Sequence, residues 1–154
     1  MLIGEIQTER LYLIPSAGSR LTLKVFAYSG TDKPIELSAW VKTGWNWRYR
    51  WPTRLRPDQA GRLAEHLRTA ASLPSLDESG PRRQVVGRIE GGVRRGPITV
   101  SLVRRHPGSV GFSMADRLAF GAYTFLFKAE NARLVAEWID YGVQAAADAN
   151  AERP

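Results

Sequence analysis

A block of 12 residues occurs twice in the sequence, 72 positions apart. Residues 56–67 align with residues 128–139 without a gap, and most aligned pairs keep their charge sign or their amide, small or aliphatic character. Just upstream, the pair Trp51 and Tyr123 continues the match. Self-similarity at a fixed spacing is typical of a supersecondary unit that is repeated and packed against its copy. The chain is therefore expected to contain one small unit twice.

A second alignment pairs residues 20–40 with residues 83–103, at an offset of 63. It matches Pro34 with Pro97, among other residues. Because this offset is nine residues smaller than that of the first block, it predicts a nine-residue insertion in the second copy. Two blocks in the same order in both halves favour a duplication.

Alternating apolar and polar residues predict strands in the first half over residues 20–28 and 35–42. The turn sequence Ser29-Gly30-Thr31-Asp32 lies between them. Aromatic residues alternate with arginines over residues 45–51, which predicts a third strand. Residues 3–14 are expected to add a further strand, which charged residues interrupt.

A helix is expected after the third strand, over residues 57–72. Pro57 fits the first helical position and Asp58 the acidic first turn. Leu63, Ala64, Leu67 and Ala71 recur at helical spacing. In the second half, strands are predicted over 83–90, 97–105 and 119–127, an extra short strand over 110–114, and a helix over 129–148. Leu134, Val135, Trp138, Ile139 and Val143 are predicted to form the apolar face of that last helix.

The expected fold class is α+β, with two tandem antiparallel ββββα units packed as an intramolecular pseudo-dimer. The predicted division is a first unit over residues 1–73, a linker over 74–82, a second unit over 83–148 and a frayed tail over 149–154. Small sheets cannot each cover an apolar face alone. We therefore expect the amphipathic helices to pack against each other and against the sheets, which makes one compact domain.

The chain is strongly basic. It carries 22 Lys+Arg against 15 Asp+Glu, a net charge of +7, and most of its cations are arginines. The planar guanidinium suits phosphate, so this bias favours a polyanionic partner, although arginine-rich coding alone would produce the same composition. The sequence contains no cysteine, no apolar run long enough to span a membrane and no signal-peptide pattern at its start. These features predict a cytoplasmic protein.

The most informative segment is the tryptophan-rich strand, where four aromatic residues fall on one face and two arginines on the other. The aromatic residues are Trp45, Trp47, Tyr49 and Trp51, and the arginines are Arg48 and Arg50. Single-strand binders combine flat side chains for base stacking with cations along the backbone. Alternatively, the aromatic face is core, and the arginines with Lys42 and Trp40 form the exposed functional side. The nucleic-acid-binding residues predicted here are Lys42, Trp45, Arg48, Arg50 and Arg54.

A second basic stretch lies in the second half. The sequence Gly91-Gly92-Val93-Arg94-Arg95-Gly96 predicts a flexible hairpin tip that carries two cations and reaches around a nucleic-acid strand. The alternative is a solvated hairpin whose charge serves solubility. The nucleic-acid-binding residues predicted in this half are Arg88, Arg94, Arg95, Arg104 and Arg105.

Catalysis has little support in the sequence. His66 and His106 are the only histidines, and they lack metal-ligand spacing. No nucleophile elbow, phosphate-binding loop or acidic cluster for a two-metal nuclease is present. We therefore predict a protein that is not an enzyme and needs no cofactor or metal.

One local pattern resembles a known superfamily of single-strand binders. A strand with aromatic and basic residues runs into an acid-amide helix start in residues 51–59, Trp51-Pro52-Thr53-Arg54-Leu55-Arg56-Pro57-Asp58-Gln59, and again in residues 123–131. This arrangement of four strands and a helix resembles the positive cofactor four coactivators, the Whirly proteins and the Pur-alpha repeats. The chain departs from that pattern in three ways: both units lie on one chain, the second unit has the predicted insertion, and a lysine-rich Whirly signature is lacking.

The resemblance implies binding of single-stranded DNA or RNA by strand faces, without catalysis. The alternative is a protein-interaction module that docks through the tryptophan-rich strand and the last helix. Arginine and aromatic residues are enriched in both kinds of interface, so composition does not separate them. The sequence leaves open the choice between DNA and RNA, further homo-oligomerisation and a protein partner.

Overall fold

The computed structural model describes residues 1–8, 20–42, 48–90, 95–104, 110–116 and 121–153, and at some strand positions only the backbone. Within these ranges the chain forms two four-stranded antiparallel sheets, each followed by a helix, so the predicted α+β fold of two tandem units is confirmed. The first unit contains β1 (Leu2–Thr8), β2 (Arg20–Ala27), β3 (Ile35–Lys42), β4 (Arg48–Leu55) and α1 (Pro57–Ser72). The second contains β5 (Arg83–Ile89), β6 (Arg95–Val103), β7 (Val110–Asp116), β8 (Gly121–Phe127) and α2 (Ala129–Ala151). In both sheets the strands lie in sequence order.

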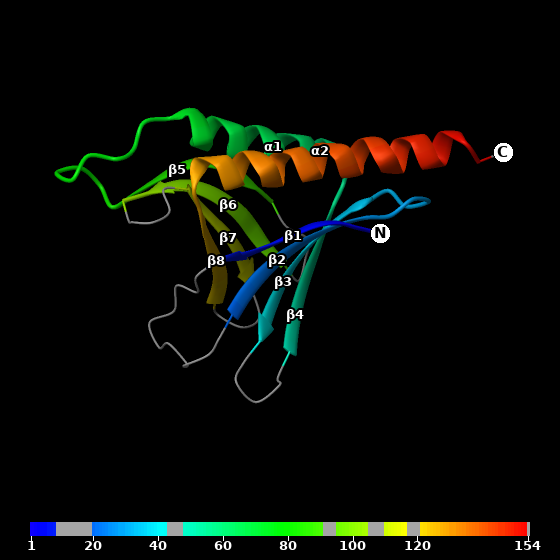
Figure 1. The fold of residues 1–154 in the computed structure, drawn as a ribbon, viewed down its shortest axis with the longest axis horizontal. Helices are drawn as coiled ribbons and strands as arrows, with labels where there is room; N and C mark the ends of the chain where they lie inside the picture. The colour runs from blue at the N-terminus through cyan, green and yellow to red at the C-terminus, as the bar shows by residue number, and fades with distance from the viewer. Residues whose placement is uncertain (9–19, 43–47, 91–94, 105–109, 117–120, 154) are drawn as a thin grey trace.

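The two helices lie side by side along one side of the molecule, and both sheets lie beneath them (Figure 1). Each helix packs mainly on the sheet of the other unit: α1 lies on β5 and β6, and α2 lies on β2 and β1. One hydrophobic core therefore joins both sheets and both helices. The predicted packing of helices on each other and on the sheets is confirmed, and the exchange of helices between units is an addition to it.

Two glycines mark where the exchanged helices approach the sheets. A Cβ atom added at Gly4 of β1 would lie 2.4 Å from the indole of Trp138, and one added at Gly87 of β5 would lie 2.4 Å from the imidazole of His66. The strand pairing is irregular beside both glycines. His66 and Trp138 are 72 residues apart, so they occupy the same position of the repeated helix. His66 thus has a packing role, as a lone histidine usually does.

The strand register corrects the second sequence alignment. Gly4 pairs with Val25 and Gly87 with Val100, so equivalent positions are 83 residues apart in β1 and β5 and 75 apart in β2 and β6. The alignment at an offset of 63 is wrong, because it places β2 on β5 and β3 on β6. The alignment failed because strands with alternating apolar and polar residues have similar sequences wherever they lie in a sheet. The offset falls to 72 at the helices, so the longer connections belong to the first unit and the second has no nine-residue insertion.

The tryptophan-rich strand is β4, the fourth strand of the first sheet, and it lies further along the chain than predicted, at Arg48–Leu55 instead of residues 45–51. It continues past Pro52, which is tolerated because β4 is an edge strand with one row of backbone groups unpaired. The first strand ends at Thr8. The remainder of its predicted range, and Trp45 and Trp47, lie outside the described residues.

In the second sheet, the short strand predicted over residues 110–114 is the third strand of the sheet, β7, which pairs with β6 and β8. β6 covers Arg95–Val103, two residues earlier than predicted, and β8 begins at Gly121. β7 is longer than expected and occupies the place of β3 in the first unit.

The last helix extends to Ala151, beyond the predicted end near residue 148. Its final turn is held by the β2–β3 turn: the Gly30 N–H donates to Asn150 Oδ1 at 2.8 Å, and Arg153 donates to Ser29 Oγ at 3.0 Å. Gly30 has a φ of 72°, the left-handed conformation expected of this turn. The tail predicted to fray is therefore helical over its first residues. Leu134, predicted in the apolar face, is 37% exposed.

Candidate nucleic-acid interface

The first sheet has a core face and an opposite face. Alternate residues of β2 and β3 are at most 5% exposed and belong to the core cluster: Leu21, Leu23, Val25, Ala27, Ile35, Leu37 and Ala39. The intervening positions form the opposite face, which we call the first outer face. Its described side chains on β2, β3 and β4 are Thr22, Lys24, Phe26, Glu36, Ser38, Trp40, Pro52 and Arg54, with Tyr28 just beyond β2. On β1, Glu5 and Gln7 lie in the same rows as Lys24 and Thr22.

Two cation–aromatic pairs lie on the first outer face. The Lys24 ammonium lies 4.3 Å from the centroid of the Trp40 ring, and the Arg54 guanidinium lies 4.6 Å from that of Tyr28. Phe26 stacks on Tyr28, with centroids 6.3 Å apart. Such pairs hold cations against ring faces and keep both side chains extended over the sheet. The face therefore presents flat rings and positive charge together.

Both cations of these pairs are also oriented by other groups. Arg54 Nε donates to the carbonyl oxygen of Lys33 at 3.1 Å, and Lys24 Nζ lies 3.7 Å from a carboxylate oxygen of Glu5. Arg54 remains exposed, and 27% of the Lys24 side chain is accessible. The two cations are thus positioned by the sheet and still accessible to an anion.

The strand register adds further cations to the rows of this face. Arg50 pairs with Trp40, and Lys42 pairs with both Arg20 and Arg48. Because pairs opposite each other share a face of the sheet, these positions continue the first outer face toward the start of β4. Their side chains lie outside the described atoms. The register fits the prediction that the arginines of β4 share a face with Lys42 and Trp40, while Tyr49 pairs with the core-face position Val41.

A carboxylate lies within this basic face. Glu36 is 5% exposed, and its Oε2 accepts a hydrogen bond of 2.7 Å from the hydroxyl of Ser38, which is fully buried. In the register, Glu36 lies between Phe26 and Arg54. A buried carboxylate needs hydrogen bonds or positive neighbours, and this face supplies both.

Of the residues predicted to bind nucleic acid in the first half, Arg54 lies on the first outer face, and Lys42, Arg48 and Arg50 lie in its rows. Trp45 lies outside the described residues. The sequence interpretation missed Lys24 and Tyr28. Lys24 could have been found from the hairpin, because the turn between β2 and β3 fixes which residue of β2 lies near Trp40.

Within the described residues, the predicted nucleic-acid-binding residues of the second half are not seen to gather at one site. Arg88 lies exposed on the edge strand β5, and Arg95 begins β6. Arg94 and Arg105 lie outside the described residues.

Arg104 serves the linker. Its guanidinium donates to the carbonyl oxygens of Asp77, Glu78 and Gly80, the last at 3.0 Å, and its backbone N–H donates to Arg82 at 2.9 Å. These contacts occupy the side chain that the sequence predicted to bind nucleic acid.

Positive charge is concentrated on the sheets and not on the helices. The four strands of the first sheet contain six Lys+Arg and two glutamates. α2 contains four acidic residues and one arginine, and α1 contains two of each kind. A polyanion is therefore attracted to the sheet side of the molecule and not to the helix side.

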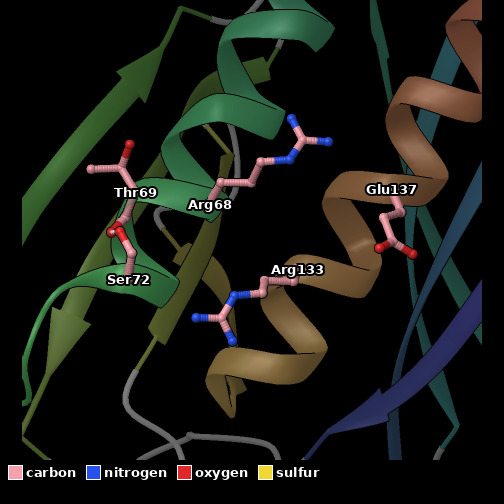
Figure 2. A pocket seen from close by; sticks show the side chains of 5 residues that line it. All are labelled: Arg68, Thr69, Ser72, Arg133 and Glu137. Carbon is pink, nitrogen blue, oxygen red and sulfur yellow. Dashed lines mark hydrogen bonds between the residues drawn. The ribbon is translucent and has the colours of Figure 1, made fainter.

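Arginines of the helix layer are used in internal contacts. A cavity of ≈ 430 Å³ between the helices is lined by Arg68, Thr69, Ser72, Arg133 and Glu137 (Figure 2). Arg68 forms an ion pair with Asp140, and Arg133 donates to the carbonyl oxygen of Ala71 at 3.0 Å. With both guanidinium groups engaged and a carboxylate in the lining, this cavity is poorly suited to an anion.

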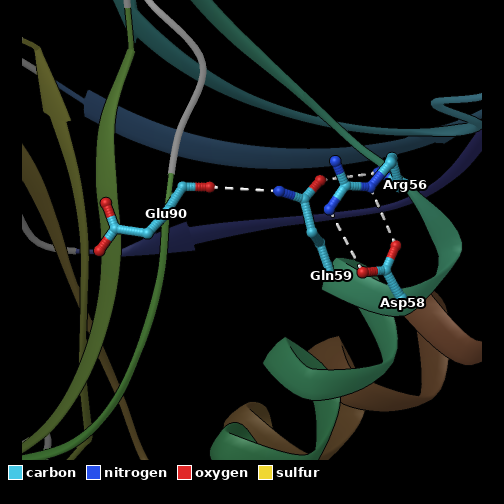
Figure 3. Close-up of polar contacts among 4 residues, drawn as sticks. All are labelled: Arg56, Asp58, Gln59 and Glu90. Atoms are coloured by element: carbon cyan, nitrogen blue, oxygen red, sulfur yellow. Dashed lines mark hydrogen bonds and ion pairs between the residues drawn. The ribbon is translucent and has the colours of Figure 1, made fainter.

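The start of α1 is another internal polar cluster (Figure 3). The side-chain amide of Gln59 accepts from the Arg56 N–H at 3.0 Å and donates to the Glu90 carbonyl at 3.3 Å, which ties the helix start to the end of β5. The hydrogen bond from the Arg56 guanidinium lowers the pKa of the Asp58 carboxyl below its ordinary value. These groups serve the helix start.

No group of three or more metal-ligating side chains converges within the part of the chain that the structure describes. Neither described helix combines the length and the apolar character needed to cross a bilayer. No protein-family model matches the chain, and no curated protein matches its sequence.

Proposed function

We propose that this protein binds single-stranded nucleic acid, DNA or RNA, through the first outer face and without catalysis. The observation that carries the proposal is the pair of cation–aromatic contacts, Lys24 on Trp40 and Arg54 on Tyr28. A cytoplasmic location belongs to the same proposal, for which the lack of cysteine is modest support.

The chemistry of the face matches what an unpaired strand offers. Unpaired bases expose flat π-faces that stack on aromatic side chains, worth about 1–3 kcal/mol per base, and the phosphates attract the neighbouring cations. Trp40, Phe26 and Tyr28 are half-buried, so each of these residues keeps some accessible surface on a face rich in positive charge. In a duplex the base faces are stacked on one another, so this combination favours single strands.

The resemblance to the positive cofactor four, Whirly and Pur-alpha proteins supports the same proposal, because strand faces of that superfamily bind unpaired bases. Membership of the superfamily is itself part of the proposal. Sequence preference is not expected to be strong, since stacking and phosphate contacts accept every base.

The test is fluorescence anisotropy with a labelled random oligonucleotide of about 30 nucleotides, single-stranded and duplex, at low and moderate salt. We expect submicromolar binding that prefers the single strand and weakens steeply with salt. Arg54→Gln should weaken binding, whereas Arg62→Gln, which removes one charge from the helix layer, should not. Absence of binding at low salt would refute the proposal.

A second candidate function is a protein-interaction module that uses the last helix. Tyr141 is 63% exposed and Leu134 is 37% exposed, and a spacing of seven residues places both on one side of α2. Exposed aromatic residues are enriched in protein interfaces. Self-association that is lost in Tyr141→Ser, measured by sedimentation, would support this candidate.

A further inference from the structure

The two sheets can be compared position by position because both have the same strand order and their register is known. The row Glu5–Lys24–Ser38–Pro52 of the first sheet corresponds to the row Arg88–Thr99–Ser113–Thr124 of the second. The first residue of each row directly follows a glycine that lies against the helix of the other unit: Glu5 follows Gly4, and Arg88 follows Gly87. The cation in the second strand, Lys24, is thus a threonine in the second sheet.

The next row gives the same contrast. Phe26, Glu36 and Arg54 correspond to Ser101, Gly111 and Leu126. The row on the other side of Ser38 and Pro52 contains Trp40 and Arg50, which correspond to Ala115 and Ala122. Both cation–aromatic pairs of the first outer face therefore lack counterparts in the second sheet.

The corresponding face of the second sheet, the second outer face, is lined by small hydroxyl side chains. Thr99 and Ser101 are at most 5% exposed, and the hydroxyls of Ser113 and Thr124 are hydrogen-bonded to each other at 2.8 Å. Arg83 Nε donates to Ser101 Oγ at 3.3 Å. Among the described side chains of this face, the cations lie on the edge strand β5, as Arg83 and Arg88, and aromatic rings are missing.

We infer that the chain binds one single-stranded segment, on the first outer face alone, although its fold repeats the sheet twice. This inference rests on the proposed function. A pseudo-dimer with two equivalent faces would hold two strands, as in an opened duplex. Here the described side chains of the second outer face include no ring on which a base could stack, and the edge cations Arg83 and Arg88 give only weak, nonspecific attraction. The preferred ligand is one continuous unpaired strand.

The test is a stoichiometric titration with an oligothymidine of about eight nucleotides, a length within the range of one small binding face. Native mass spectrometry and sedimentation, at concentrations above the dissociation constant, should give one oligonucleotide per chain. Two per chain would overturn the inference. The wild-type stoichiometry alone decides this, so the result does not depend on any variant folding.

Two double variants that each remove two cations identify the face. Lys24→Thr with Arg54→Leu places on the first outer face the residues found at the same positions of the second. This variant should weaken binding at least about tenfold, because each lost cation contacts both an aromatic ring and, in the complex, a phosphate. Arg83→Gln with Arg88→Gln should leave affinity within about twofold and the stoichiometry unchanged. The reverse pattern would overturn the inference. If wild-type protein binds no oligonucleotide at all, the proposed function itself is refuted, which is a distinguishable result.

Discussion

The indole of Trp138 lies against Gly4 so closely that a Cβ atom there would be 2.4 Å from the ring. The two residues belong to different units of the repeat, and His66 and Gly87 reproduce the contact in the other direction. Each glycine admits a large side chain from the partner unit's helix. The close contact between the units therefore depends on a glycine in the first strand of each sheet.

Gly4→Ala and Gly87→Ala should each destabilise the protein by about 1–3 kcal/mol, because the added methyl group must displace a ring held between helix and sheet. Gly61→Ala is the matched control. No atom from outside the local helix backbone lies within 4 Å of a Cβ at Gly61, on the exposed side of α1, so that change should be neutral or stabilise by up to about 1 kcal/mol. Chemical denaturation of the three variants measures the differences; equal stability of all three would contradict the close packing.

Trp138→Ala should lower the free energy of unfolding by about 3 kcal/mol, since the half-buried indole joins α2 to the first sheet. Tyr141→Ala, on the same helix but 63% exposed, should change it by less than about 0.5 kcal/mol. Thermal and urea unfolding would reveal the difference. A wild-type unfolding curve for Trp138→Ala would refute the packing of α2 described above.

Arg48→Ala with Arg50→Ala should weaken single-strand binding and reduce the slope of log affinity against log salt by about 1–2, since each lost phosphate contact removes about 0.7–0.9 from it. Thermal stability should hardly change, because the register places both residues in rows of the first outer face. Anisotropy titrations at several salt concentrations give the slope. A large fall in the unfolding temperature would assign this strand face to the core.

Arg104→Ala should destabilise the protein by about 1 kcal/mol and leave nucleic-acid binding unchanged, because its guanidinium holds linker carbonyls. Circular dichroism and anisotropy on the same preparation separate the two effects. Loss of binding without loss of stability would instead show that Arg104 contacts nucleic acid, as predicted from the sequence.

Local patterns in the sequence were sufficient to predict the helices and most strands. Pro57 and Asp58 located the start of α1, and the alternation over residues 20–28 located β2. The strand over residues 45–51 was displaced because its aromatic residues alternate well while Pro52 looks like an end. A proline interrupts a central strand but is tolerated in an edge strand. Whether a strand lies at the edge depends on the order of all strands in the sheet, which the local sequence does not reveal.

Which helix covers which sheet could not be predicted, because periodicity defines an apolar stripe but not the surface that it meets. The same holds for the interface. The arginines of β4 were recognisable from their own strand, whereas the contact of Lys24 with Trp40 depends on the register of two strands. The contact of Arg104 with linker carbonyls could not be predicted, because an arginine in a basic stretch looks the same in the sequence whether it contacts solvent, phosphate or a carbonyl oxygen.

The exchange of helices between units also determines when the chain can fold. During synthesis the first sheet and α1 emerge early, yet the helix that covers the first sheet is α2, the last element of the chain. Because α2 is made after both sheets, the apolar face of β1 and β2 remains without its cover until the second unit has been synthesised. The nascent first half is therefore expected to depend on chaperones, and separately produced halves should acquire structure only when mixed.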